Sequence, residues 1–263
     1  MMLMMMMCTA ACWRDEVPRR AIVGGAPVAP SARALDGDTI AGRDHLSRGY
    51  PARNPDGSVN AVVEIPSGTT AKFEVDDEDG RLRWARKRED GSRREIDYLP
   101  YPVNYGMVPN TLALDGDTLD IFVLGRGIER AHVAATKVIG VLEMAHDGVR
   151  DDKLVAVAIE PALRNGFSEL DELDQRYPAT RVILELWFSH YWGKDATHVV
   201  GWGNAATARA VLDEAIARLK PHAGACTAQR DPAGPRPRAA SPFAAPARSL
   251  MLRALHAVFG SAC

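Results

Sequence analysis

The fold is organised around the stretch Leu114-Asp115-Gly116-Asp117-Thr118-Leu119-Asp120-Ile121. Its three carboxylates lie within six residues, and apolar residues flank them on both sides. Ionised carboxylates this close together repel one another unless they are solvated or share cations. Oxygen ligands on a short turn suit hard cations, so the stretch predicts binding of Mg²⁺ or Mn²⁺ rather than zinc. Taken alone, it also fits a surface turn rich in Asp and Gly.

The residues around this stretch indicate many short strands followed by helices. Runs rich in β-branched residues at 59–65, 121–124, 136–144 and 154–159 predict strands separated by turns. Residues 98–106 are too rich in proline for a central strand, and we expect an ordered loop there. The order predicts a mainly β protein with α (α+β), in which helices pack on a small β-barrel.

The period of the apolar residues becomes helical after residue 168. We expect Ser168 to N-cap a helix over 169–177 and Asn204 to cap a helix over 205–220. A further helix is expected over 181–191. In that helix a spacing of four places these side chains on one face: Val182, Leu186 and His190.

Length and composition set the domain organisation. The chain has 263 residues, of which 46% are hydrophobic, and a net charge of -2. We expect a flexible lead-in over 1–45, one folded domain over 46–222 and a disordered tail rich in Pro, Ala and Arg over 223–263. The near-neutral charge gives no case for a nucleic-acid partner. Because all four cysteines lie near the ends, residues 13–225 contain no disulfide or zinc framework.

The first twelve residues leave the compartment open. They are apolar and rich in Met, and Cys12 follows two alanines as at a lipoprotein cleavage site. No basic residue precedes them, which counts against a secretion signal. We expect a cytoplasmic protein, with an exported or lipid-anchored protein as the alternative if residues 1–12 belong to a signal.

Six motifs together resemble the family I soluble inorganic pyrophosphatases, and they occur in that family's order between residues 46 and 222. The motifs are Val63-Glu-Ile-Pro-Ser-Gly68 with Lys72-Phe-Glu74, Tyr101-Pro-Val-Asn-Tyr-Gly106, Asp115-Gly-Asp-Thr-Leu-Asp-Ile121, Ile139-Gly-Val-Leu142, Asp151-Asp-Lys-Leu-Val-Ala156 and Gly201-Trp-Gly-Asn204. The resemblance implies an OB-like five-stranded β-barrel with C-terminal helices. It also implies Mg²⁺-dependent hydrolysis of inorganic diphosphate to two phosphates by a metal-bound water.

The resemblance also implies a role for each matching residue. Asp117 would be the general base toward that water. The metal ligands would be Glu74, Asp115, Asp120, Asp147 and Asp151. The phosphate-binding residues would be Lys72, Arg94, Tyr105, Lys153 and Tyr191, with Glu64 and Tyr101 lining the site. Several Mg²⁺ ions are expected, with Mn²⁺ as a substitute, and a homo-oligomer is expected.

One departure from the family's pattern concerns the metal ligands. A ligating aspartate is expected five residues before Asp151, where this chain has His146. Asp147 is adjacent and could serve after a shift of one residue. If His146 is itself the ligand, a softer ion is favoured.

Two further ambiguities concern phosphate binding. The chain has Trp192 where a lysine is expected, and Lys194 could reach the same phosphate. Arg93 and Arg94 are adjacent, and we prefer Arg94 because it lies seven residues before Tyr101.

Two other functions compete with this interpretation. Residues 111–118 match the apolar strand and Asp-x-Asp-x-Thr motif of haloacid-dehalogenase-like phosphatases, in which Asp115 would be a covalent nucleophile and Asp117 the acid/base. That motif normally opens a doubly wound α/β domain, whereas a β-rich segment precedes it here and another strand follows it. The second alternative is a pyrophosphatase-like binding module that has lost its activity.

Overall fold

The computed structural model describes residues 32–159, 167–191 and 197–219, which form eleven strands and three helices. The signal-like segment 1–12 and the tail 223–263 lie outside the described residues, as do Trp192 and Lys194. Within the described part of the chain, no helix is both long and apolar enough to cross a membrane.

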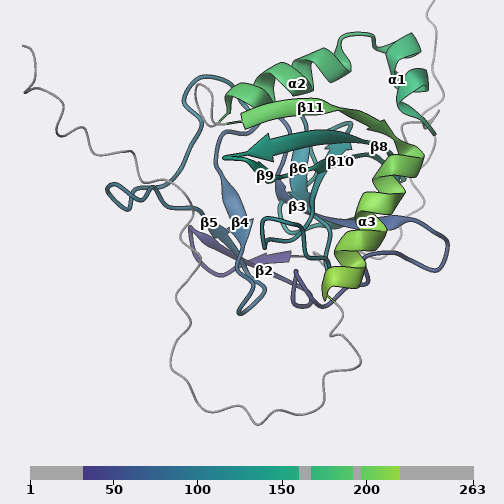
Figure 1. The fold of residues 1–263 in the computed structure, drawn as a ribbon. Coiled ribbons are helices and arrows are strands. Elements are labelled where there is room, and N and C mark those ends of the chain that lie inside the picture. Colours follow the sequence, from purple (N-terminus) through teal and green to yellow (C-terminus); the bar gives the residue numbers. More distant parts are fainter. Residues whose placement is uncertain (1–31, 160–166, 192–196, 220–263) are drawn as a thin grey trace, which may run out of the picture. The chain divides into compact units, whose positions relative to one another are not determined.

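Five strands of the larger sheet form a ring that is close to a barrel (Figure 1). Their order is β10-β7-β6-β3-β8, and β8 pairs back onto β10. The ring strands are β3 (Val59–Ile65), β6 (Asn104–Met107), β7 (Asp120–Leu124), β8 (Val133–His146) and β10 (Lys153–Ala158). β7 and β10 are parallel, while the other pairs in the ring are antiparallel. The predicted mainly β fold with a five-stranded barrel is confirmed.

The longest strand of the ring, β8, has 14 residues and joins several partners. Its first half pairs with β3, and its middle pairs with β10. Its end pairs with β9 (Val149–Arg150) and β11 (Thr197–Asn204), which lie outside the ring. The sequence predicts only the β-branched centre of this strand, because the terminal residues have no strand signal of their own.

One ring strand lies in the segment expected to be a loop. β6 begins at Asn104, two residues after Pro102, and pairs with β3 and β7. The expectation of a loop is therefore wrong for the end of the segment 98–106. The prolines occupy only the approach to the strand, so they remove no hydrogen bond from the ring.

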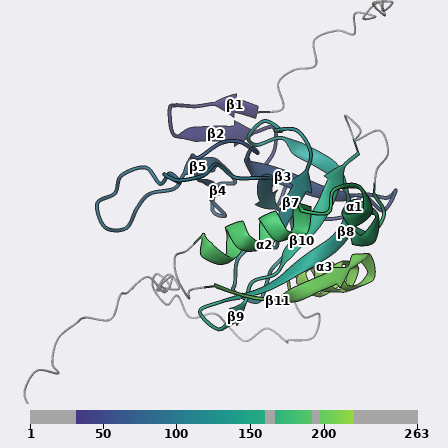
Figure 2. The same ribbon diagram turned by 90° about the horizontal axis from the view of Figure 1, so that it is seen from above.

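A second sheet contains four short strands in the order β1-β2-β5-β4 (Figure 2). They are β1 (Ala32–Ala34), β2 (Thr39–Gly42), β5 (Leu82–Trp84) and β4 (Phe73–Val75). The sequence predicts a flexible lead-in up to residue 45, and the structure differs for residues 32–42. Ile40 of β2 pairs with Leu82 and packs against the cluster that contains it. β1 and β2, with three and four residues, are too short to give a periodic signal, which is why the sequence does not indicate these two strands.

The three helices are α1 (Leu170–Arg176), α2 (Thr180–His190) and α3 (Ala205–Leu219). Asn204 caps α3 as predicted, because its side-chain oxygen accepts bonds of 3.0 Å from the backbone N–H groups of Ala206 and Thr207. Ser168 does not cap α1: Glu169 occupies the N-cap position and makes no side-chain cap bond. The Ser168 hydroxyl instead accepts a hydrogen bond from Lys137.

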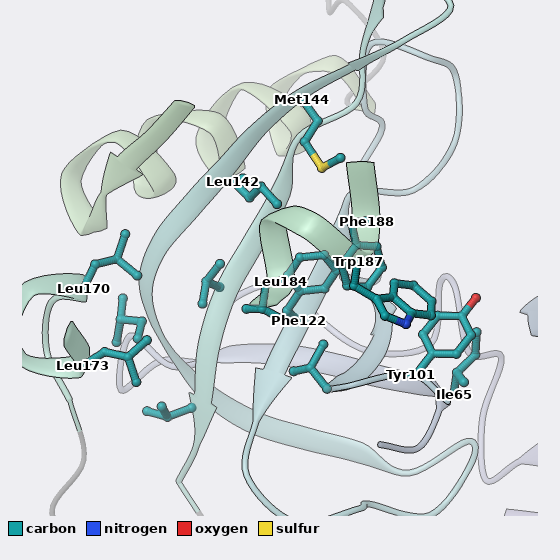
Figure 3. Packing of buried hydrophobic residues seen from close by; sticks show 14 of the residues in the cluster. Ile65, Tyr101, Phe122, Leu142, Met144, Leu170, Leu173, Leu184, Trp187 and Phe188 are labelled. Carbon is teal, nitrogen blue, oxygen red and sulfur yellow. The ribbon is translucent and has the colours of Figure 1, made fainter. Parts of the chain in front are cut away.

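The row of side chains whose spacing predicts α2 is not the face by which this helix packs. Leu184, Trp187 and Phe188 are buried beside Phe122 of β7 and Tyr101 (Figure 3). Val182 and Leu186 of the predicted row are 55% and 59% exposed. Both rows have helical spacing, so the period alone could not choose between them.

The opposite faces of the ring strands carry different clusters. Phe122 and Val155 pack with α1 and α2, whereas Leu154 and Ala156 pack with Leu212 of α3. This alternation follows from the two-residue period of a strand. Among the described strands only β7 and β10 form a parallel pair, so this part of the chain is not the doubly wound parallel domain that the dehalogenase-like alternative requires.

Candidate active site

One cavity of about 750 Å³ collects most of the candidate residues. Twelve of the thirteen line it: Glu64, Lys72, Glu74, Arg94, Tyr101, Tyr105, Asp115, Asp117, Asp120, Asp151, Lys153 and Tyr191. Asp147 does not line it. Residues from β3, β4, β6, β7, β10 and the end of α2 therefore meet at one place, although up to 127 positions separate them in the sequence, from Glu64 to Tyr191.

The parallel pairing of β7 with β10 builds the centre of this cavity. The register places Lys153 beside Asp120, at the start of both strands. The Lys153 Nζ donates to Asp120 Oδ2 at 2.5 Å and to Asp151 Oδ1 at 2.7 Å. The Tyr105 hydroxyl donates to the same Asp120 oxygen at 2.6 Å. Two carboxylates are therefore held together by one buried ammonium group.

The ionisation of these groups follows from burial and from their neighbours. Burial raises the pKa of Asp120, against the opposing effect of Lys153. Burial lowers the pKa of Lys153, but Asp120 and Asp151 outweigh it, so the net shift is upward and the ammonium form is favoured. Burial and the Asp120 charge raise the pKa of Tyr105, so its hydroxyl remains a donor.

Asp115 and Asp117 lie on the turn that leads into β7. The turn is tied by Asp117 N–H donating to Asp115 Oδ1 at 3.1 Å and by Ala113 N–H donating to the Asp117 carbonyl at 2.7 Å. Gly116 lies between them with a φ of 95°, which glycine adopts without a steric penalty. Burial and then the charges of Asp115 and Asp120 raise the pKa of Asp117 to about 6. Asp117 is thus the carboxylate of this turn that is best suited to accept a proton near neutral pH.

Lys72 and Glu74 form the wall contributed by the start of β4. They are two residues apart on an extended segment, so their side chains share a face, and their charged atoms lie 2.5 Å apart. Glu64 lies beneath them and accepts a hydrogen bond of 2.8 Å from the backbone N–H of Val75. Burial raises the pKa of Glu64 to about 8, so it is mostly protonated at neutral pH.

Aromatic rings form the wall on the side of α2. The Tyr101 hydroxyl donates to the Tyr191 hydroxyl at 2.7 Å, and the Trp187 ring stacks on Tyr191. The Lys72 ammonium lies 5.9 Å from the centre of the Tyr191 ring, and the Arg94 guanidinium lies 5.6 Å from it. Tyr191 therefore adjoins both cations at the edge of the cavity.

The structure separates the two adjacent arginines. Arg94 lines the cavity. Arg93 forms an ion pair of 2.5 Å with Asp38, and its guanidinium lies 4.3 Å from the centre of the Trp84 ring. Adjacent residues of an extended hairpin point in opposite directions, which agrees with the choice of Arg94.

His146 and Asp147 are also separated. His146 lines the cavity, and its side chain is 16% exposed. Asp147 lies in the turn between β8 and β9, with a φ of 48°, and its side chain is 42% exposed. Asp147 therefore does not line the cavity, whereas the other expected metal ligands do.

Some cavity residues were missed by the sequence analysis. A basic hairpin, residues 86–93, contributes Arg86, Lys87 and Arg88 to the rim. Thr197 of β11 also lines the cavity. The basic run Arg86-Lys87-Arg88 can be recognised in the sequence as a cluster of positive charge. Nothing in the sequence indicates that Thr197 lies opposite His146.

The donor set fits hard divalent cations. Glu74, Asp115, Asp120 and Asp151 bring four carboxylates to one cavity, and oxygen ligands are those that Mg²⁺ and Mn²⁺ prefer. In the described residues no group of three or more His, Cys, Asp or Glu is already arranged around a common point as a metal site. Lys153 explains part of this difference from a preformed metal site, because its ammonium group binds two of the four carboxylates, those of Asp120 and Asp151.

Comparison with known proteins gives a consistent result. The profile of the family described as inorganic pyrophosphatase matches residues 61–220. The inorganic pyrophosphatase of Xylella fastidiosa is 33% identical over 169 residues, which are 62% of this chain and 89% of the relative.

Solved structures agree with this match. The inorganic pyrophosphatase of Neisseria gonorrhoeae has 31% identity and a TM-score of 0.54, over 62% of this chain and 91% of that one. An N-terminally truncated vacuolar soluble pyrophosphatase of Trypanosoma cruzi, solved in complex with PPi, has 26% identity and a TM-score of 0.58. That match covers 67% of this chain and 74% of the other.

Proposed function

This chain belongs to the inorganic pyrophosphatase family and is an inorganic diphosphatase, and from this premise we propose that the cavity around Asp117 is its active site. The observation that carries the proposal is that twelve of the thirteen residues to which the resemblance assigns a role line one cavity. The substrate is inorganic diphosphate, and the products are two phosphates.

The proposed cofactor is Mg²⁺, with Mn²⁺ as a substitute. Glu74, Asp115, Asp120 and Asp151 would hold the ions, because the resemblance assigns them as ligands and all four line the cavity that contains Asp117. When bound, such ions neutralise phosphate oxygens and lower the pKa of a water molecule. The absence of cysteine between residues 13 and 225 also agrees with a site for a hard cation, since no thiolate is available there as a ligand.

The substrate would be bound by donors in two parts of the cavity. Lys72 and Arg94 lie beside Tyr191, while Lys153 lies beside Tyr105. Charged donors form the strongest hydrogen bonds to phosphate oxygens. Diphosphate binding also has support from the Trypanosoma cruzi relative, whose structure contains PPi.

Asp117 would accept the proton of the attacking water. The water oxygen forms a bond to one phosphorus atom, and the bridging oxygen leaves with the other phosphate. The proton moves to an Asp117 carboxylate oxygen, while Lys153, Lys72 and Arg94 stabilise the charge that develops on the departing phosphate. Supporting this role, Asp117 has a raised pKa and faces the same cavity as all three cations.

The test is phosphate release from diphosphate by the purified chain at millimolar Mg²⁺, with and without a chelator. We expect release that depends on the metal. Release by the dehalogenase-like route would instead leave a phosphoryl group on Asp115, which mass spectrometry of acid-quenched protein detects. No release under any metal condition would favour the inactive binding module.

We also propose that the protein is a homo-oligomer. Supporting this, three apolar residues of α2 are each more than 50% exposed: Val182, Ile183 and Leu186. Contiguous apolar patches on soluble proteins commonly mark contact surfaces. We expect light scattering to give an oligomer for the parent and a smaller particle for Val182→Asp/Leu186→Asp, with Ala206→Asp on α3 as control. An unchanged mass in the double variant would exclude this face as the contact.

A further inference from the structure

We propose that His146, not Asp147, is the side chain that β8 contributes to the metal site, so that this site contains one nitrogen ligand. Such a site binds a borderline ion such as Co²⁺ more tightly, relative to Mg²⁺, than an all-oxygen site would. The inference rests on the proposed function, because it concerns the metal used by the same cavity.

The strand register places His146 near Asp151, on the same face of the β8–β9 hairpin. Met144 and His146 are two residues apart on β8 and both line the cavity, as expected for side chains on one face of a strand. The backbone N–H of Asp151 donates to the Met144 carbonyl at 2.9 Å, so Asp151 lies opposite Met144. One step along the same face, roughly 6–7 Å away, comes His146.

A neighbour on β11 holds the imidazole ring. The register pairs Thr197 with His146, and Thr197 Oγ1 lies 3.3 Å from His146 Nδ1. With Nδ1 donating to this hydroxyl, Nε2 carries the lone pair that a metal ligand needs. Metal-binding histidines are commonly oriented in this way through their other nitrogen.

The conformation of the turn explains why an aspartate stands at position 147. Asp147 forms the two-residue turn between β8 and β9 with Gly148, and their φ values are 48° and 80°. A turn with both values positive favours Asp-Gly. Asp147 Oδ2 lies 3.7 Å from His146 Nε2, but its side chain is 42% exposed and does not line the cavity.

The choice between the two residues changes the chemistry of the site. With Asp147 the ligands would all be oxygen, the set that suits Mg²⁺. With His146 one ligand is an imidazole nitrogen, which raises the affinity for ions later in the first transition series more than for Mg²⁺.

The experiment measures metal binding without substrate. Calorimetric titrations of Mg²⁺ and Co²⁺ give the ratio of the two affinities for the parent and for His146→Asp, Asp147→Asn and His198→Ala. His198 is the matched control, since it is the exposed histidine next to Thr197 on β11. Asn at position 147 retains a residue that tolerates the positive φ of the turn. The visible absorption of bound Co²⁺ reports on the ligand set independently of catalysis.

We expect His146→Asp to lower the ratio of Co²⁺ to Mg²⁺ affinity at least about tenfold and to change the Co²⁺ spectrum. Asp147→Asn and His198→Ala should leave both unchanged. An unchanged ratio in His146→Asp, or a change confined to Asp147→Asn, would overturn the inference. Phosphate release by the parent at Mg²⁺ concentrations that fill the site tests the proposed function separately, so the two can fail independently.

Discussion

Asp117 has surroundings that suit a residue which gains and loses a proton near neutral pH. Burial raises its pKa to about 6, and Asp115 and Asp120 add to the shift. We predict that Asp117→Asn lowers kcat by about 10²–10⁴, because the proton acceptor is lost.

The affinity for Mg²⁺ separates this role from that of a ligand. In Asp117→Asn the Mg²⁺ affinity should change far less than kcat, since all the proposed ligands remain. Asp77→Asn is the control, as Asp77 also lines the cavity but has no proposed role. Near-normal turnover in Asp117→Asn would show that another group takes the proton.

Glu64 links the cavity to the stability of the fold. Burial raises its pKa from 4.5 to about 8. The folded protein therefore retains a proton that the unfolded chain releases above pH 4.5. By linkage, Glu64 makes the free energy of unfolding fall as the pH rises from about 5 to 8, by an amount on the order of a few kcal/mol.

We predict that Glu64→Gln removes most of this decline. Urea unfolding of the metal-free protein at several pH values measures it, with Glu214→Gln on the exposed side of α3 as control. If the parent and Glu64→Gln showed the same slope against pH, Glu64 would not be the buried acid responsible.

At the residue scale, the sequence predicts which motifs meet but not which of two neighbours faces the cavity. The resemblance to the pyrophosphatase motifs predicted that Asp115, Asp120 and Lys153 share a site, and all three line one cavity. Spacing could not decide between His146 and Asp147, because that depends on where β8 ends and its turn begins. The structure supplies this information through the pairing of His146 with Val149.

The basic hairpin, residues 86–93, is important because it lies at the rim of the cavity. It follows β5 and projects beyond the small sheet (Figures 1 and 2), with Lys87 N–H bonded to the Ser92 carbonyl at 2.8 Å. Arg86, which pairs with Asp38, lines the rim of the cavity together with Lys87 and Arg88. A cationic rim raises the rate at which an anion such as diphosphate arrives.

We predict that Lys87→Ala/Arg88→Ala lowers kcat/KM for diphosphate about 3–10-fold at low salt and changes kcat little. The difference should shrink at high salt, because the field is then screened. Steady-state kinetics over a range of ionic strength measures this, with Arg209→Ala on the exposed face of α3 as control. A loss that did not depend on salt would indicate direct contact with the substrate instead.

Sequence patterns predicted long elements better than short ones. Strand β3 has the predicted bounds because its run is rich in valine and isoleucine and is followed directly by Pro66. β1 and β2 have three and four residues, too few for a pattern. The packing face of α2 depended on which apolar row met Phe122 and Tyr101, and this is set by tertiary contacts.

At the scale of the whole molecule, the described fold accounts for every motif of the proposed site. We predict that a chain of residues 32–219 folds and hydrolyses diphosphate at close to the full-length rate. A chain of residues 44–219 should be less stable by about 1–3 kcal/mol, because it loses the burial of Ile40 against Leu82.

Urea unfolding and phosphate release for both truncated chains measure these effects. The comparison is internally controlled, since the two chains differ only in residues 32–43. If the 32–219 chain failed to fold, an outer segment would be part of the packed domain. Equal stability of the two chains would show that β1 and β2 add nothing to it.

The bond of Lys153 to both Asp120 and Asp151 has a consequence for how the molecule comes to be active. This side chain serves as a built-in counter-ion for two of the carboxylates, so part of the repulsion within the acidic centre is offset without a cation from solution. A newly made chain can reach its final shape before it meets magnesium. The concentration of metal would then determine the fraction of folded protein that is active, rather than the fraction of protein that is folded.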